Sequence, residues 1–155
     1  MRVAVAGTFG PVHDGHRSLF EHALCFGDGG VIVALTSDEL ATETRTTPRP
    51  IPSFEDRRDV VETTIEECDE WGRDVEIRRL EDEHGIASEE PSLDALVLSP
   101  ETATELEAIN ARRRERGLEP LSGIVAPYVL AEDGERISST RMVHGEIDEH
   151  GRLLE

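Results

Sequence analysis

The sequence predicts an α/β protein in which a parallel sheet carries helices on both faces. Continuous apolar runs at residues 31–35 and 93–98 have the pattern of strands that are buried on both sides. Segments with apolar residues at helical spacing, such as residues 60–68, alternate with these strands. A strand, a helix and a second strand follow one another at the start of the chain, which indicates a right-handed parallel unit. We therefore expect a single domain over residues 1–155.

The individual elements follow from local signals along the chain. The expected strands are residues 2–6, 31–35, 74–80, 93–98 and 123–126. The expected helices are residues 15–26, a helix that Ser53 caps and that continues to 68, a helix from Pro100 to 116, and residues 141–145. Three prolines between residues 42 and 52 indicate a loop. His84 has no partner at a ligand spacing and is expected at the surface, and residues 146–155 are expected to form a loosely held acidic tail.

The composition excludes several classes of protein. The 155 residues include 34 Asp and Glu against 16 basic residues, all of them Arg, for a net charge of −18. Such an acidic surface repels nucleic acid, so neither DNA nor RNA is an expected partner. No apolar run approaches the roughly 20 residues that cross a bilayer, and no apolar signal region opens the chain. We expect a cytoplasmic protein with no membrane contact.

The charge and the cysteines also indicate the kind of cytoplasm. Concentrated salt screens the self-repulsion of a strongly acidic surface. Together with the absence of Lys, this favours a protein from a salt-loaded cytoplasm, as in halophilic archaea, over an ordinary acidic protein. Cys25 and Cys68 have no metal-like spacing, so reduced thiols are expected rather than a disulfide framework.

A glycine-rich stretch between the first strand and the first helix is the most informative part of the chain. It runs Ala6-Gly7-Thr8-Phe9-Gly10-Pro11-Val12-His13-Asp14-Gly15-His16. Glycine lets backbone N–H groups approach a ligand, and a helix N-terminus favours anions, so the stretch suits phosphate. His13 and His16 are three residues apart, which places them on one helix face. We predict a nucleoside triphosphate held against two imidazoles rather than a tight turn with two surface histidines.

Three turns are expected to meet at one edge of the sheet, namely residues 7–16, 99–102 and 137–141. In open α/β sheets, ligands bind beyond the carboxyl ends of the strands. The convergence of these turns therefore predicts one composite site.

Two of these turns carry the resemblance to a known family. The first stretch resembles the G-T-F-D-x-x-H-x-G-H signature of the nucleotidyltransferase superfamily, and Ile137-Ser138-Ser139-Thr140-Arg141 resembles its second signature, I-S-S-T-R. Softer segments at residues 35–40, 54–58, 97–102 and 113–118 are most similar to the archaeal phosphopantetheine adenylyltransferases. The resemblance implies a five-stranded parallel Rossmann-like nucleotidyltransferase sheet. It also implies an enzyme of coenzyme A biosynthesis that transfers the adenylyl group of ATP to 4′-phosphopantetheine, giving dephospho-coenzyme A and pyrophosphate.

The resemblance further implies a role for each matching residue. The expected catalytic residues are His13, His16 and Arg141, of which the histidines would stabilise the α-phosphate and Arg141 would be a charged clamp. The expected ATP-binding residues are Gly7, Thr8, Phe9, His16, Ser99, Glu101, Ser138, Ser139, Thr140 and Arg141. The expected acceptor-binding residues are Thr8, Arg45 and Arg57. Mg²⁺ would enter with ATP, since no carboxylate cage or other dedicated metal site is evident, and coenzyme A or dephospho-coenzyme A would bind as product.

Two departures from the family pattern leave alternatives open. Gly10 stands where the signature usually has Asp, which removes a carboxylate from the turn. The loop after the second strand offers Arg45 and Arg49 as anion contacts where the family often has Lys, with Arg45 as the expected stand-in. The same chemistry could act on FMN, NMN or glycerol phosphate, or the protein could be a nucleotide sensor without turnover. A class I aminoacyl-tRNA synthetase shares the H-x-G-H logic, but this chain is too short and too acidic for tRNA. The oligomeric state is left open.

Overall fold

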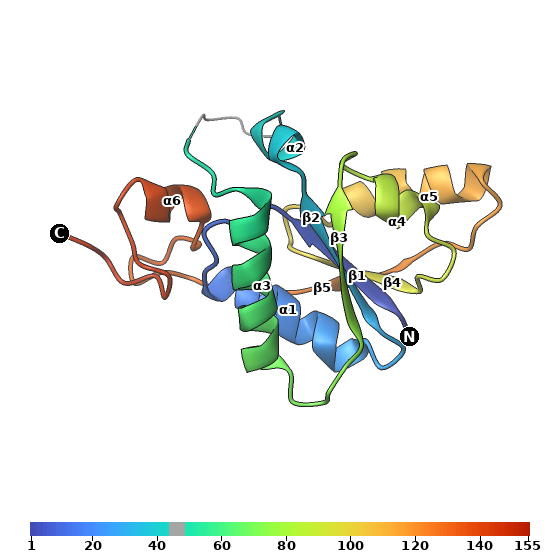
Figure 1. The fold of residues 1–155 in the computed structure, drawn as a ribbon, viewed down its shortest axis with the longest axis horizontal. Helices are drawn as coiled ribbons and strands as arrows, with labels where there is room; N and C mark the ends of the chain where they lie inside the picture. Colours follow the sequence, from blue (N-terminus) through green and yellow to red (C-terminus); the bar gives the residue numbers. More distant parts are fainter. Residues whose placement is uncertain (44–48) are drawn as a thin grey trace.

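The computed structural model describes residues 1–43 and 49–155. Five parallel strands form one sheet in the order β3-β2-β1-β4-β5 (Figure 1). The strands are β1 (Val3–Gly7), β2 (Val31–Thr36), β3 (Val75–Leu80), β4 (Ala95–Leu98) and β5 (Ser122–Val125). The chain steps from β1 outward to β2 and β3, and then returns to the other side of β1 for β4 and β5. The predicted parallel α/β fold is confirmed, with its switch point between β1 and β4.

Helices cover both faces of this sheet (Figure 1). The helices are α1 (Asp14–Phe26), α2 (Asp38–Glu43), α3 (Phe54–Cys68), α4 (Gly85–Glu89), α5 (Glu105–Glu115) and α6 (Ser139–Val143). Alternate strand residues such as Val5 and Val33 pack with α1 and α3, whereas Ala4 and Ile32 pack with α4 and α5. Because both faces are covered, all six residues of β2 are buried, as its continuous apolar run predicts. None of the helices formed by residues 1–43 and 49–155 is long and apolar enough to cross a membrane.

Three helices differ from the sequence expectation, because α2 and α4 were not among the expected helices and α5 begins later than predicted. The predicted start at Pro100 is wrong, because α5 begins at Glu105. Ser99 and Thr102 exchange hydrogen bonds between backbone and side chain, which closes a separate turn before the helix. The acidic segment between β3 and β4, in which no helix was expected, contains the short helix α4.

The C-terminal segment is packed against the molecule and is not loosely held. Ile147 is 1 % exposed and belongs to a small apolar cluster with Ala131 and Ile137. The carbonyl of Glu149 accepts a hydrogen bond from the backbone N–H of Asp14, the first residue of α1, at 2.9 Å. The apolar side chain at position 147 outweighs the acidic composition that predicted a free tail.

Candidate active site

The two predicted histidines cap the start of α1, at the carboxyl end of β1. His13 is the N-cap residue, and its Nδ1 accepts a hydrogen bond from the backbone N–H of Gly15 at 3.0 Å. His16 Nδ1 accepts from the backbone N–H of His13 at 3.3 Å, so the pair forms a capping box made of imidazoles. The two rings stack, with centroids 3.8 Å apart. Because each Nδ1 is an acceptor, a neutral ring at either position carries its proton on Nε2.

His13 is held in its neutral form. The pKa of His13 is lowered to about 4, mainly by burial; the carboxylate of Asp14 opposes the shift, and Arg136 makes a smaller contribution that lowers the pKa. The residue is 7 % exposed. At neutral pH it is therefore an uncharged hydrogen-bond donor, and small changes of pH do not alter that protonation state.

A cavity of about 650 Å³ lies beside this pair. It brings together side chains from the turns after β1 and β4 and from the start of α6. The predicted site residues that line it are His13, His16, Ser99, Glu101, Ser138, Ser139 and Thr140. A smaller cavity of about 170 Å³ shares His16 and Ser99 with it and is also lined by Gly7 and Phe9. The three turns therefore converge on one region, as the position of the strand ends predicts.

Hydrogen bonds join the second signature to the first. Ser138 caps α6 by accepting from the backbone N–H of Arg141 at 3.2 Å. The hydroxyl of Ser139 donates to the carbonyl of Pro11 at 2.6 Å. The hydroxyl of Thr140 accepts from Arg49 Nε at 3.2 Å. These contacts hold the two signatures together although they lie at opposite ends of the chain.

Two arginines near the second signature, Arg141 and Arg136, differ from the sequence expectation. The guanidinium of Arg141 forms ion pairs with Asp133 and Glu146, and the hydrogen bond that it donates to Asp133 raises its pKa. It does not line either cavity described above, so a clamp on phosphate stays a prediction. Arg136, which lines the larger cavity and pairs with Glu101, was missed. Its place directly before the I-S-S-T-R signature is the signal that would have found it.

Arg57 lies beneath the first turn, with a fully buried side chain. Its Nη1 donates to the carbonyl of Thr8 at 3.0 Å, and its Nη2 pairs with Asp38 at 3.1 Å. All three guanidinium nitrogens contact protein groups, so contact with an acceptor phosphate stays a prediction for Arg57. Arg45 lies outside the described residues. Thr8 is 8 % exposed, and its hydroxyl accepts from Thr36 at 3.1 Å.

The turn at Gly10 accommodates the buried stem of Arg57. A Cβ at Gly10 would come within 2.7 Å of Arg57 Cδ and 3.3 Å of Pro52 Cδ. Because Gly10 has no side chain, there is room for the buried side chain of Arg57.

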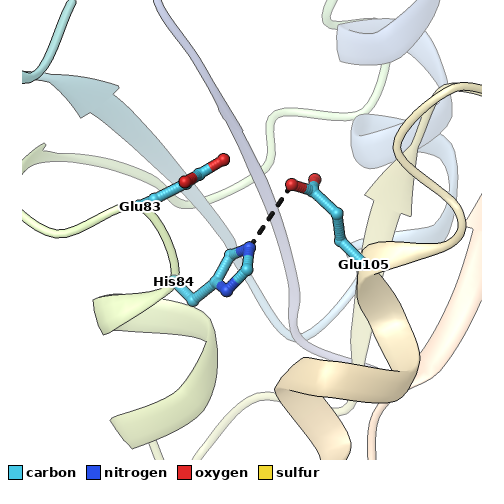
Figure 2. Close-up of side chains that lie close together, drawn as sticks. All are labelled: Glu83, His84 and Glu105. Carbon is cyan, nitrogen blue, oxygen red and sulfur yellow. Dashed lines mark hydrogen bonds and ion pairs between the residues drawn. The ribbon is translucent and has the colours of Figure 1, made fainter. Parts of the chain in front are cut away.

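His84 is half-buried, contrary to the expectation of a surface residue. Its Nε2 lies 3.4 Å from Oε1 of Glu105, across the gap between α4 and α5 (Figure 2). Among the residues that the structure describes, Glu83, His84 and Glu105 are the group whose arrangement could hold a metal ion, with ligand atoms within 4.8 Å of one another. We assign no ion to them, because an ion pair between His84 and Glu105 accounts for the contact.

The fold and the histidine pair define a nucleotidyltransferase, and the comparison with family models agrees. The cytidylyltransferase-like family matches residues 4–145. Phosphopantetheine adenylyltransferase of Methanosarcina acetivorans is 42% identical over 153 residues, which cover 98% of this chain and 95% of that protein. The enzyme of the same name from Methanopyrus kandleri is 42% identical over 96% of this chain and 91% of its own length. This chain belongs to the family of phosphopantetheine adenylyltransferases, as the sequence resemblance predicted.

Solved structures show the same fold. A protein of unknown function from Archaeoglobus fulgidus superposes with a TM-score of 0.71 at 28% identity, covering 81% of this chain and 89% of that one. Pantothenate synthetase from Thermus thermophilus superposes with a TM-score of 0.57 at 17% identity, covering 92% of this chain and 61% of that one. The second likeness concerns the fold alone.

Proposed function

We propose that this protein transfers the adenylyl group of ATP to 4′-phosphopantetheine, giving dephospho-coenzyme A and pyrophosphate. The observation that carries the proposal is the convergence of both signatures on the cavity of about 650 Å³, with two imidazole N–H donors at its side. The family to which the chain belongs supplies the acceptor, because its curated relatives carry the name phosphopantetheine adenylyltransferase.

The reaction needs positioning and charge stabilisation more than a protein nucleophile. A phosphate oxygen of 4′-phosphopantetheine attacks the α-phosphorus of ATP, and the bond from that phosphorus to the pyrophosphate oxygen breaks. Negative charge builds on the transferring and leaving oxygens. His16 and His13 donate Nε2–H groups to these oxygens, and neither has to gain or lose a proton for the step.

The remaining residues bind and orient the two substrates. Ser138, Ser139 and Thr140 bind the β- and γ-phosphates at the larger cavity, for which the Ser139 hydroxyl must leave the carbonyl of Pro11. Ser99 and Glu101 bind the nucleotide, and the turn at Gly7, Thr8 and Phe9 holds the two substrates together. Arg45, Arg57 and Arg141 are the proposed charged contacts, of which Arg141 must leave Asp133 to reach a phosphate.

A divalent cation accompanies the nucleotide in this class of enzyme, and we propose Mg²⁺. The cation neutralises phosphate charge when it is bound. The donor set fits an ion that arrives with ATP, because Glu101 is the carboxylate lining the larger cavity and Mg²⁺ is held mostly by substrate phosphates and one or two carboxylates.

The test is pyrophosphate release from ATP and Mg²⁺ in molar KCl, with and without 4′-phosphopantetheine. We expect release that requires the pantetheine and that falls steeply, but stays measurable, in His16→Ala. His22→Ala is the matched control, since His22 lies on the same helix and its Nδ1 contacts the carbonyl of Ser18. Release with FMN, NMN or glycerol phosphate instead would move the reaction to another acceptor. ATP binding without release for any acceptor would leave a nucleotide sensor.

A further inference from the structure

The backbone at Phe9 is strained and surrounded by fixed partners. Phe9 has φ 49°, in the left-handed region that bulky side chains avoid. Its ring is 2 % exposed, packs against Phe20 with centroids 4.9 Å apart, and meets the ring of His16 edge-on at 5.1 Å. Such a conformation persists only where the surroundings over-determine it. The position of the His16 imidazole therefore depends on what holds this turn.

Two arginines hold the carbonyls on either side of Phe9. Arg57 Nη1 donates to the carbonyl of Thr8 at 3.0 Å, and Arg49 Nη1 donates to the carbonyl of Gly10 at 3.0 Å. Both arginines come from the segment between α2 and the first turn of α3. We call Arg49 and Arg57 the arginine bracket.

Arg49 also connects the first turn to the second signature. Its Nε donates to the hydroxyl of Thr140 at 3.2 Å, so a single planar guanidinium spans Gly10 and Thr140. A Lys ammonium is a point donor and does not reproduce this fork. Movement of the Arg49 segment would thus change the first turn and the phosphate-facing hydroxyls together.

We propose that the arginine bracket is a positioning device: Arg49 and Arg57 fix the turn at Phe9, the Phe9 ring places the His16 imidazole, and Arg49 sets Thr140 in register with it. The proposal rests on the proposed function, in which His16 is catalytic. It gives Arg49, which no signature contains, a positioning role in catalysis through the first turn and Thr140. Two guanidinium donors thus take the place of the carboxylate that the turn lacks because residue 10 is Gly.

The test is a double-mutant cycle in the full chain, with pyrophosphate release at saturating ATP and 4′-phosphopantetheine. Arg49→Gln is expected to lower kcat by about tenfold to a hundredfold while KM for ATP changes by less than about twofold. Arg49→Lys is expected to restore little of the loss. In a His16→Ala background, Arg49→Gln is expected to change kcat by less than about twofold, because the group that it positions is gone. Arg58→Gln, which removes an exposed charge beside Arg57, is the matched control and is expected to leave kcat unchanged.

Three outcomes would overturn the bracket: an equal loss in both backgrounds, a rise in KM alone, or full rescue by Lys. The ring resonances of His16 in the ATP-free protein give a readout that needs no turnover. Arg49→Gln is expected to shift the His16 resonances and leave those of His22 in place; unchanged His16 resonances would overturn the bracket. If the unmutated protein released no pyrophosphate with any acceptor, the proposed function would fail, and these resonances would still decide whether the bracket positions His16.

Discussion

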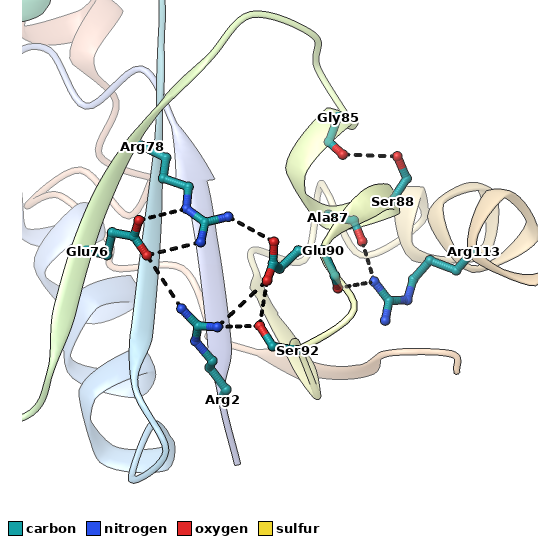
Figure 3. Close-up of polar contacts among 9 residues, drawn as sticks. All are labelled: Arg2, Glu76, Arg78, Gly85, Ala87, Ser88, Glu90, Ser92 and Arg113. Carbon is teal, nitrogen blue, oxygen red and sulfur yellow. Dashed lines mark hydrogen bonds and ion pairs between the residues drawn. The ribbon is translucent and has the colours of Figure 1, made fainter. Parts of the chain in front are cut away.

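Arg57 and Arg113 are equally buried and serve different parts of the molecule. Arg57 is 1 % exposed and its donors reach the carbonyl of Thr8 in the first signature. Arg113, on α5, is 0 % exposed and donates to the carbonyls of Ala87 and Glu90 at 2.9 Å each (Figure 3). It also donates to the carbonyl of Glu119 at 2.7 Å. Arg57 has a carboxylate partner in Asp38, whereas Arg113 Nη2 has no hydrogen-bond partner within the described part of the chain. Burial lowers the pKa of the Arg113 guanidinium.

The difference shows that a buried arginine is not by itself a sign of catalysis. Both side chains satisfy main-chain carbonyls that a nearby helix or turn leaves without partners. What separates them is the identity of those carbonyls. The Thr8 carbonyl belongs to the turn that carries the histidines, whereas the carbonyls held by Arg113 belong to α4, to the residue after α4 and to the loop after α5. Arg57 therefore orders part of the candidate site, whereas Arg113 stabilises the packing around α4 and α5.

The strongest test of this comparison replaces each arginine by methionine. Both Arg57→Met and Arg113→Met leave buried carbonyls without donors and are expected to lower the free energy of unfolding by about 3 kcal/mol, measured by urea unfolding. At a temperature where both variants stay folded, Arg57→Met is expected to lose about a hundredfold in kcat and Arg113→Met less than about twofold. Equal losses of kcat would show that the comparison is wrong.

A second test concerns His13, which is buried without charge. The pKa of His13 is about 4 in the folded protein against 6.5 in an unfolded chain. Between these values the unfolded state binds more protons, so the free energy of unfolding falls as the pH drops from 6.5 towards 4 and levels off below it. The full effect is about 3 kcal/mol. His13→Asn keeps an N-cap acceptor but does not titrate, so unfolding measured from pH 7 to 4 should show a shallower slope. An unchanged slope would exclude His13 as its source.

A smaller effect is expected where Gly10 meets the stem of Arg57. Gly10→Ala places a Cβ about 2.7 Å from Arg57 Cδ. Overpacking of this kind costs roughly 1–3 kcal/mol, and displacement of Arg57 should lower kcat as well. Gly85→Ala is the matched control, because its nearest neighbour atom would be Asp82 Cβ at 3.3 Å, far from the first turn. If Gly10→Ala kept full stability and kcat, the fit between positions 10 and 57 would not matter.

The smallest effect belongs to Glu90, whose carboxylate accepts from Ser92 at 2.7 Å and Arg78 at 3.0 Å (Figure 3). The hydroxyl of Ser92 and then Arg78 hold the pKa of Glu90 below its usual range. Its contribution to stability is therefore present above pH 4.5 and is lost as the pH falls through the lower folded value. Glu90→Gln should cost about 1 kcal/mol at pH 7 and nothing in strong acid, without a change in kcat. A fall in kcat would show that the region around Glu90 and Arg113 contributes to the candidate site.

The sequence predicted the strand-turn-helix units and the two signatures, because apolar periodicity and glycine placement are local signals. It did not predict which arginines are buried. The resemblance implied an acceptor phosphate as the partner of Arg57, but its charge is compensated by Asp38 and it also donates to the carbonyl of Thr8, which is distant in sequence. The segment at residues 113–118 contributed only to the resemblance, which gave no sign of the three carbonyls that Arg113 holds. Such pairings depend on the tertiary fold, and no local pattern reports them.

The hydrogen bond between Asp14 and Glu149 has a consequence for synthesis of the protein. Asp14 leaves the ribosome early. Glu149, which accepts from its backbone N–H, and His150, whose ring contacts its carboxylate, emerge much later, with His150 lying 136 positions further along the chain. Ser138 to Thr140 emerge only shortly before these residues. A nascent chain therefore carries His13 and His16 long before it carries Ser138 to Thr140, and the cavity that these residues line together is complete only after the later residues have emerged.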